Sequence, residues 1–145
     1  MKKIKLIRQR HENGCSIACI SMVTGKTYDE IDADFSTDFN QNGLMLDKTI
    51  EYLGAHNYSL IHKYITQYGH KDFGKDEMLN PFAPKHIVRV QPKADSDYGH
   101  VMVMDADGQL FCPDGQTDEE ARNSYIVTDV IGIWGDNDLR KKKKQ

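Results

Sequence analysis

The sequence of 145 residues has few of the features that mark secreted, membrane or disulfide-stabilised proteins. It contains only three cysteines (Cys15, Cys19 and Cys112), and an odd number without a secretion signal indicates free thiols. No apolar run approaches the ~18 residues that a transmembrane helix needs. After Lys5 only two apolar residues precede Arg8, whereas a signal peptide needs ~7–15. We therefore expect a cytoplasmic protein without a membrane partner.

The chain also has little net charge, because 19 Lys and Arg residues stand against 22 Asp and Glu residues, giving −3. Ten of the cations lie in residues 1–10 and 140–145, which leaves 9 cations, 22 anions and a net charge of −13 between them. An acidic body disfavours the neutralisation of phosphates on which nucleic-acid affinity depends, so no nucleic-acid partner is expected. We interpret residues 1–136 as a single domain and residues 137–145 as a basic, disordered tail.

What the chain does have is the composition of a globular domain, with 39% hydrophobic and 28% charged residues. The first half has helical patterns, each bounded by a capping signal. The expected elements are a short strand over 4–7, a helix over 15–23 ended by Gly25, a helix from the Thr27–Glu30 capping box to Phe35, and a helix over 43–53 ended by Gly54.

The second half changes to short apolar runs separated by turn residues, which is typical of strands. Asp107-Gly108 lies between two such runs and indicates a hairpin. The expected strands are residues 58–61, 86–90, 100–104, 109–112, 125–127 and 131–134. Helices followed by an antiparallel sheet predict an α+β domain.

Cys15 is a candidate nucleophile because it begins a predicted helix directly after Gly14. Unpaired backbone N–H groups at that position favour the thiolate and predict a lowered pKa for the thiol. A preceding glycine allows a substrate backbone to approach closely. From spacing alone, a buried and inert Cys15 is equally compatible. Cys19, one turn later among apolar residues, is interpreted as a core residue.

A nucleophilic cysteine needs a base, which is usually distant in sequence. His100 follows a glycine and opens an apolar strand, so we expect its ring at an edge that a cleft can reach. His86 precedes a similar strand and is the competing candidate. The remaining histidines lie in polar or loop contexts and are interpreted as surface residues: His11, His56, His62 and His70.

A third group should orient the imidazole, and three aspartates follow His100. Asp105 and Asp107 belong to the hairpin turn, where aspartate is common for local reasons. Asp114 ends the returning strand and is the preferred candidate, with Asp105 as the fallback. Gln9, six residues before Cys15, could donate an amide N–H to an oxyanion.

Together these residues form a pattern that resembles a known family, the papain-like cysteine peptidases of the bacteriocin-processing type, which trim double-glycine leader peptides. The resemblance covers about residues 4–134 and implies a papain-like fold, with N-terminal helices packed on a C-terminal antiparallel sheet. It also implies a Cys-His-Asp site with a glutamine oxyanion donor, a peptide or protein substrate, and no cofactor or metal. The segments that carry it are Gln9, Cys15-Ser16-Ile17-Ala18-Cys19-Ile20-Ser21-Met22, Gly25, Gly43-Leu44-Met45-Leu46 and Gly99-His100-Val101-Met102-Val103.

Two positions depart from the family pattern. Ser16 stands where the family usually has glycine, and Cys112 stands before Pro113 where the family has aspartate. Asp114 is two residues further on and would share the face of Cys112 in an extended strand.

Several alternatives remain open at this stage. The domain could have lost catalysis and bind a peptide without cutting it. An acyl-enzyme could also support deamidation or amide transfer, because an amine can replace water as the acceptor. A zinc site using Cys15 and Cys19 with His56 and His62 is a weaker alternative, because the spacing matches no usual zinc motif. The sequence does not indicate an oligomeric state.

Overall fold

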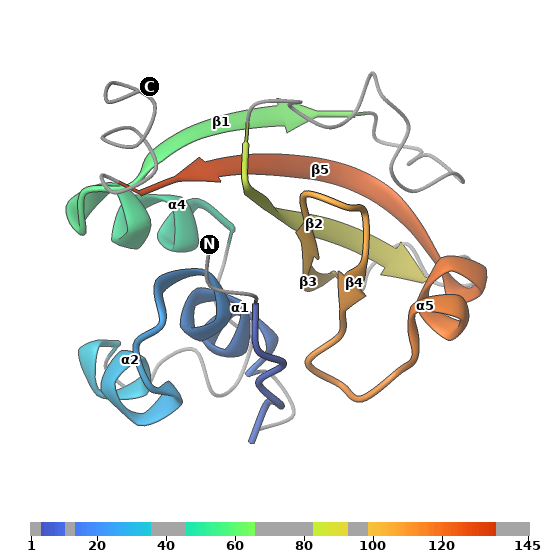
Figure 1. Cartoon of the computed structure of the whole chain (residues 1–145), viewed down its shortest axis with the longest axis horizontal. Helices are drawn as coiled ribbons and strands as arrows, with labels where there is room; N and C mark the ends of the chain where they lie inside the picture. Colours follow the sequence, from blue (N-terminus) through green and yellow to red (C-terminus); the bar gives the residue numbers. More distant parts are fainter. Residues whose placement is uncertain (1–3, 11–13, 36–45, 66–82, 93–98, 136–145) are drawn as a thin grey trace.

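A computed structural model describes residues 4–10, 14–35, 46–65, 83–92 and 99–135. Within these ranges the chain is a mixed α+β structure, as expected, with four helices and five strands (Figure 1). None of these helices is both long and apolar enough to cross a membrane. The elements are α1 (Cys15–Thr24), α2 (Tyr28–Asp34), α4 (Leu46–Ala55), β1 (Ser59–Tyr64), β2 (Lys85–Pro92), β3 (His100–Asp105), β4 (Leu110–Phe111), α5 (Asp118–Ser124) and β5 (Tyr125–Trp134).

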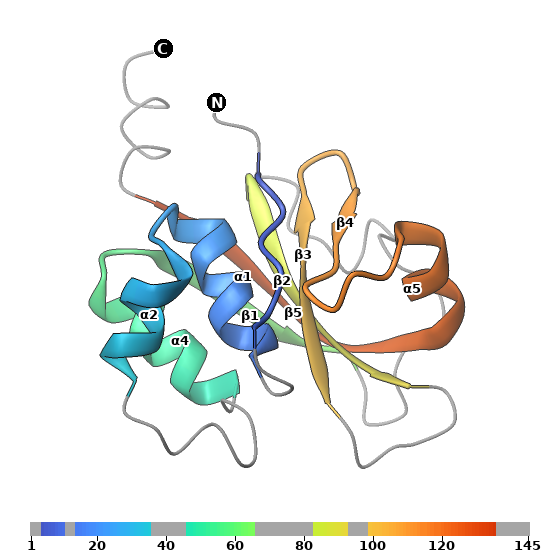
Figure 2. The same cartoon turned by 90° about the horizontal axis from the view of Figure 1, so that it is seen from below.

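The five strands form one antiparallel sheet in the order β1-β5-β2-β3-β4. Of the strands that the structure describes, β5, the last in sequence, therefore lies between β1 and β2. Figures 1 and 2 show a curved sheet, with α1, α2 and α4 gathered on one side and α5 next to the start of β5, away from these helices. The register of β2 against β5 shifts between Arg89 and Val90, which marks a β-bulge in the middle of the sheet.

Two apolar clusters cover the two faces of the sheet, and β3 contributes to both. Val101 and Val103 pack in the cluster that includes α1, α2 and α4. Met102 and Met104 pack in the second cluster, together with Tyr125 at the start of β5. Successive side chains of a strand point to opposite faces, so this division follows from the alternation along β3.

The N-terminal helices end and begin where the sequence predicts. Gly25 ends α1 in the left-handed region (φ 79°), and its N–H donates to the carbonyl of Ser21. Thr27 and Glu30 form the expected capping box at the start of α2. The Asp107-Gly108 hairpin is also confirmed, since Gly108 has a φ of 88° and its N–H donates to the Asp105 carbonyl at 3.1 Å.

Three expectations about elements are wrong. Residues 4–7 form no strand; Ile4 and Ile7 pack against the first apolar cluster instead. Gly54 does not cap its helix, because α4 continues to Ala55 and Asn57 takes the positive φ of 69°. The two strands expected over 125–127 and 131–134 are one strand, β5, because Asp129 and Val130 also pair with β2 and Thr128 is accommodated at the bulge.

One helix was not expected. Helix α5 begins at a second capping box, formed by Thr117 and Glu120. The predicted beginning of the third helix at residues 43–45 and the predicted tail at 137–145 lie outside the described residues.

Candidate active site

Cys15 is the first residue of α1 and is half-buried. Its thiol hydrogen-bonds with backbone groups of Val101 in β3 and of Ser16. Burial raises the pKa of the Cys15 thiol, and these backbone hydrogen bonds oppose the rise without cancelling it. The expected lowering of this pKa is therefore wrong, because the effect of burial exceeds that of the hydrogen bonds that the thiol receives at the start of the helix. The thiol is protonated in the resting protein.

His100 is the first residue of β3, and only 2% of it is exposed. The expectation that its ring lies at an accessible edge is therefore wrong, because β3 lies between β2 and β4 and the ring is buried. Its ring stacks on the ring of Tyr125, with centroids 5.6 Å apart and planes at 23°. His100 Nε2 lies 3.6 Å from Asp114 Oδ2. Burial lowers the pKa of His100, and the negative charge of Asp114 opposes that lowering. A neutral imidazole therefore faces a carboxylate through Nε2, which leaves Nδ1 for proton exchange with another group.

The side chains of Cys15 and His100 lie on opposite sides of β3, at the start of the strand. The thiol reaches the backbone of Val101, the residue next to His100, whereas the His100 ring lies on the side of Tyr125. No hydrogen bond joins the two side chains among the residues that the structure describes. The two groups thus lie at the same end of β3 but on opposite sides of the strand, and no contact joins them in the resting protein.

Asp114 has a specific set of hydrogen-bond partners. Its Oδ1 accepts from the backbone N–H of Gln116 at 3.2 Å, and its Oδ2 accepts from Gln116 Nε2 at 2.9 Å and from the Tyr125 hydroxyl at 3.4 Å. Asp105 Oδ1 instead accepts from the N–H groups of Asp107 and Gln109 within its own turn, both at 2.9 Å. Of the two candidates, only Asp114 therefore faces His100.

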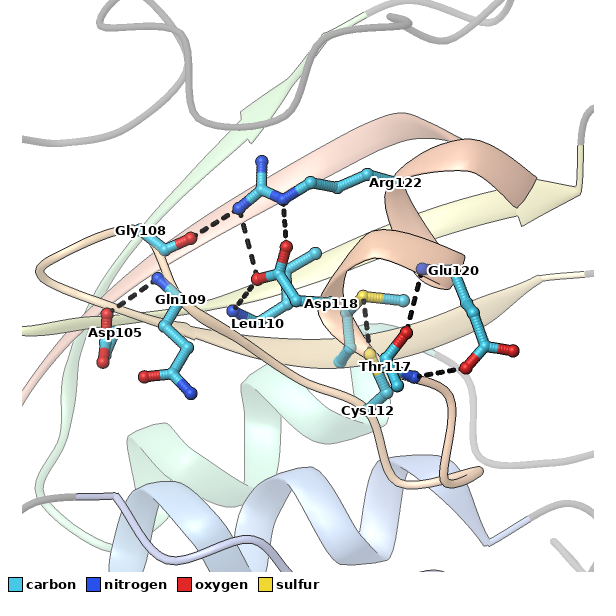
Figure 3. Close-up of polar contacts among 10 residues, drawn as sticks. Asp105, Gly108, Gln109, Leu110, Cys112, Thr117, Asp118, Glu120 and Arg122 are labelled. Atoms are coloured by element: carbon cyan, nitrogen blue, oxygen red, sulfur yellow. Dashed lines mark hydrogen bonds and ion pairs between the residues drawn. The ribbon is translucent and has the colours of Figure 1, made fainter.

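The loop that carries Asp114 is anchored at both ends (Figure 3). Before it, Cys112 is buried with its sulfur 3.9 Å from the sulfur of Met102, and burial raises the Cys112 pKa to about 12. After it, the capping box of Thr117 fixes the start of α5.

Helix α5 is in turn fixed to the hairpin between β3 and β4. Arg122 bonds to Asp118 and donates to the Gly108 carbonyl at 2.6 Å, while Asp118 accepts from the N–H of Leu110 at 2.9 Å (Figure 3). The position of Asp114 thus depends on both β4 and α5.

Gln9 is half-buried in the segment before α1. Its backbone N–H donates to the Pro113 carbonyl at 3.0 Å, and the preceding Arg8 side chain lies against Gly115. The N-terminal segment is therefore attached on either side of Asp114, which brings Gln9 to the candidate site.

The other candidate bases lie elsewhere. His86 is on the central strand β2 and 2% exposed, so the expectation of an edge position for it is wrong. His56 Nδ1 bonds to the carbonyl of Tyr52 at 2.8 Å, in the last turn of α4. His62 Nε2 hydrogen-bonds to Asp129 Oδ2 at 2.7 Å across β1 and β5, a contact between residues 67 positions apart.

No group of three or more His, Cys, Asp or Glu side chains that could hold a metal occurs in the described part of the chain. Cys19 is fully buried in the first apolar cluster, as expected for a core residue. His11 and His70 lie outside the described residues.

The comparisons with known proteins assign no family. No family model matches the chain, and no curated protein shows significant sequence similarity to it. The chemistry of the site must therefore be argued from the residues themselves.

Proposed function

We propose that this protein is a cysteine peptidase, or a related thiol amidohydrolase, with a papain-like fold. Cys15 is the nucleophile, His100 the base, Asp114 the orienting group and Gln9 an oxyanion donor. The observation that carries the proposal is the thiol at the start of a buried helix, at the same strand end as an imidazole–carboxylate pair. A nucleophile, a base and an orienting carboxylate are the parts that acyl transfer requires.

The resting protonation states determine the order of the steps. The neutral imidazole takes the thiol proton at Nδ1 as the sulfur bonds to the substrate carbonyl carbon. The oxyanion is stabilised by the Gln9 amide and by N–H groups at the start of α1. The C–N bond then breaks, and His100 returns its proton to the leaving amine. Water hydrolyses the resulting thioester and restores the Cys15 thiol.

The substrate class follows from the thioester, which forms from a peptide bond or from a side-chain amide. Water as the acceptor gives hydrolysis or deamidation, and an amine gives amide transfer. A peptide or protein is the proposed substrate. The three free cysteines fit a reducing compartment, so we place the protein in the cytoplasm.

The second candidate is a domain of the same fold that binds a peptide without cutting it. The raised pKa of Cys15 and the lowered pKa of His100 favour this alternative, because catalytic thiols usually have a lowered pKa. The absence of a hydrogen bond between the two side chains in the described structure points the same way.

A peptide-cleavage experiment separates the two candidates. Peptides from a proteolytic digest of a bacterial proteome are incubated with the wild-type protein, with Cys15→Ala and with the matched control Cys19→Ala. New peptide termini are then identified by mass spectrometry. Cleavage by the wild type and by Cys19→Ala, but not by Cys15→Ala, is the expected result. Peptides that are retained on the wild type without new termini would overturn the peptidase proposal and support binding alone.

A further inference from the structure

We propose that Gln116 and Tyr125 are positioning residues that hold Asp114 as an oriented anion beside His100. This inference rests on the proposed function for its catalytic meaning, because it concerns the same imidazole. The contacts on which it depends belong to neither Cys15 nor Gln9.

Gln116 contacts both oxygens of the carboxylate. Its backbone N–H bonds to Asp114 Oδ1 at 3.2 Å, and its Nε2 bonds to Oδ2 at 2.9 Å. The same Nε2 lies 3.0 Å from the Tyr125 hydroxyl. Two donors on one residue fix the plane of the carboxylate.

Tyr125 contacts both members of the imidazole–carboxylate pair. Its ring stacks on His100 at 5.6 Å, and its hydroxyl lies 3.4 Å from Asp114 Oδ2. It is the first residue of β5 and only 6% exposed, so its position is determined by the sheet. The ring excludes water from one face of the imidazole, and the hydroxyl limits the directions in which the carboxylate can turn.

Among the charged and titratable groups near His100, Asp114 has the decisive effect on the pKa of the imidazole. Cys112, which follows β4 and contacts Met102, is neutral because its pKa is about 12. Cys15, at the start of α1 on the other side of β3, has a raised pKa and is also neutral. Arg89 of β2 lies against Gly99, which precedes His100. Asp114 is the group that opposes the effect of burial on the imidazole, so loosening it should make His100 a weaker base.

The test is an NMR titration of the His100 ring in the full chain. Asp114→Asn removes the carboxylate charge and sets the largest expected effect. Gln116→Ala and Tyr125→Phe should each lower the His100 midpoint by about 0.3–1 pH unit, the equivalent of one lost hydrogen bond. Tyr64→Phe, on the exposed edge strand β1, is the matched control and should leave the midpoint unchanged.

Tyr125→Phe keeps the ring stack and removes only the hydroxyl, so it tests the hydrogen bond even if Gln116→Ala fails to fold. Midpoints that equal the wild type in both variants, while Asp114→Asn lowers the midpoint, would overturn the inference and leave the proposed function intact. A lowered midpoint without any change in the rate of Cys15 alkylation by iodoacetamide would support the positioning of Asp114 by Gln116 and Tyr125. The same result would contradict the proposed function, because it would show that His100 does not serve Cys15.

Discussion

Iodoacetamide should modify Cys15 of the folded protein at least about a thousandfold faster than Cys19. Cys15 is half-buried, whereas Cys19 has no exposed surface. A fully buried thiol reacts only in molecules that have opened. Small domains unfold with about 5–15 kcal/mol, and each 1.4 kcal/mol is a factor of ten, so even the low end slows Cys19 by about 10³–10⁴.

The assay quenches the reaction at intervals and maps the modified cysteines by mass spectrometry. Cys112 is an internal control, because it is 2% exposed and should react as slowly as Cys19. In denaturant all three cysteines should react at similar rates. Comparable rates for Cys15 and Cys19 in the native protein would refute the placement of Cys15 at an accessible helix start.

The pH dependence of the same reaction tests the sign of the Cys15 pKa change. Since iodoacetamide reacts with the thiolate, a raised pKa means that the rate should be below that of a free cysteine at pH 7. The rate should still rise, about tenfold per pH unit, through pH 8. A plateau between pH 5 and 8 would indicate a resting thiolate–imidazolium pair and contradict the reasoning.

Three further predictions concern stability. Gly115→Ala should lower the free energy of unfolding by about 1–3 kcal/mol, because Gly115 has a φ of 88° and an added methyl meets Arg8. The control Gly25→Ala, with open space around the added methyl, should lower it by less. Equal losses in thermal melts would exclude a role for Arg8. Since burial lowers the pKa of His100, the unfolded chain binds a proton that the folded chain does not, so stability should fall as pH drops below about 6.5. His100→Gln should reduce that fall in urea titrations from pH 8 to 5, and an unchanged pH dependence would contradict it. Thr117→Ala should cost about 0.5–2 kcal/mol in the same titrations by removing the α5 cap, and no measurable loss would show that the cap does not stabilise the fold.

The elements that the sequence predicted correctly are those with local determinants. The left-handed glycine after α1 and the capping box of Thr27 depend on residues within one turn, so they can be identified without tertiary information. The capping box at Thr117 has the same spacing and could have revealed α5.

The errors occurred where tertiary contacts decide the outcome. Residues 4–7 have the pattern of a strand, but they pair with none of the five described strands, and Ile4 and Ile7 pack against the first apolar cluster instead. The polar residues Thr128 and Asp129 lie between the two strands expected over 125–127 and 131–134. In the structure Asp129 pairs with Arg89, and Thr128, at the bulge, accepts a hydrogen bond from the Arg89 side chain at 2.8 Å, so both lie within β5.

In the candidate site, too, features set by local sequence were predicted and features set by tertiary contacts were not. Asp114 faces His100, as the parity of the strand suggested, but the partners of Asp114 were not predicted. Tyr125 had been considered only as a strand residue, and Gln116 had not been considered. Their roles depend on a stacking contact and on a loop conformation that exist only in the folded chain. The sign of the Cys15 pKa change was missed for the same reason, since burial cannot be deduced from position on a helix.

The position of β5 between β1 and β2 has a consequence for the timing of synthesis. Roughly 120 residues separate Cys15 from the end of β5, which the ribosome needs about 6–24 s to make. Until then β1 has no neighbour in the described sheet, and Ile131 and Ile133 are not yet present to complete the first apolar cluster, which packs against α1. The surroundings of the Cys15 thiol are therefore completed only when β5 has been made and inserted. Chemistry that needs the folded site can begin only after that point, and before it the cysteine lacks these partners.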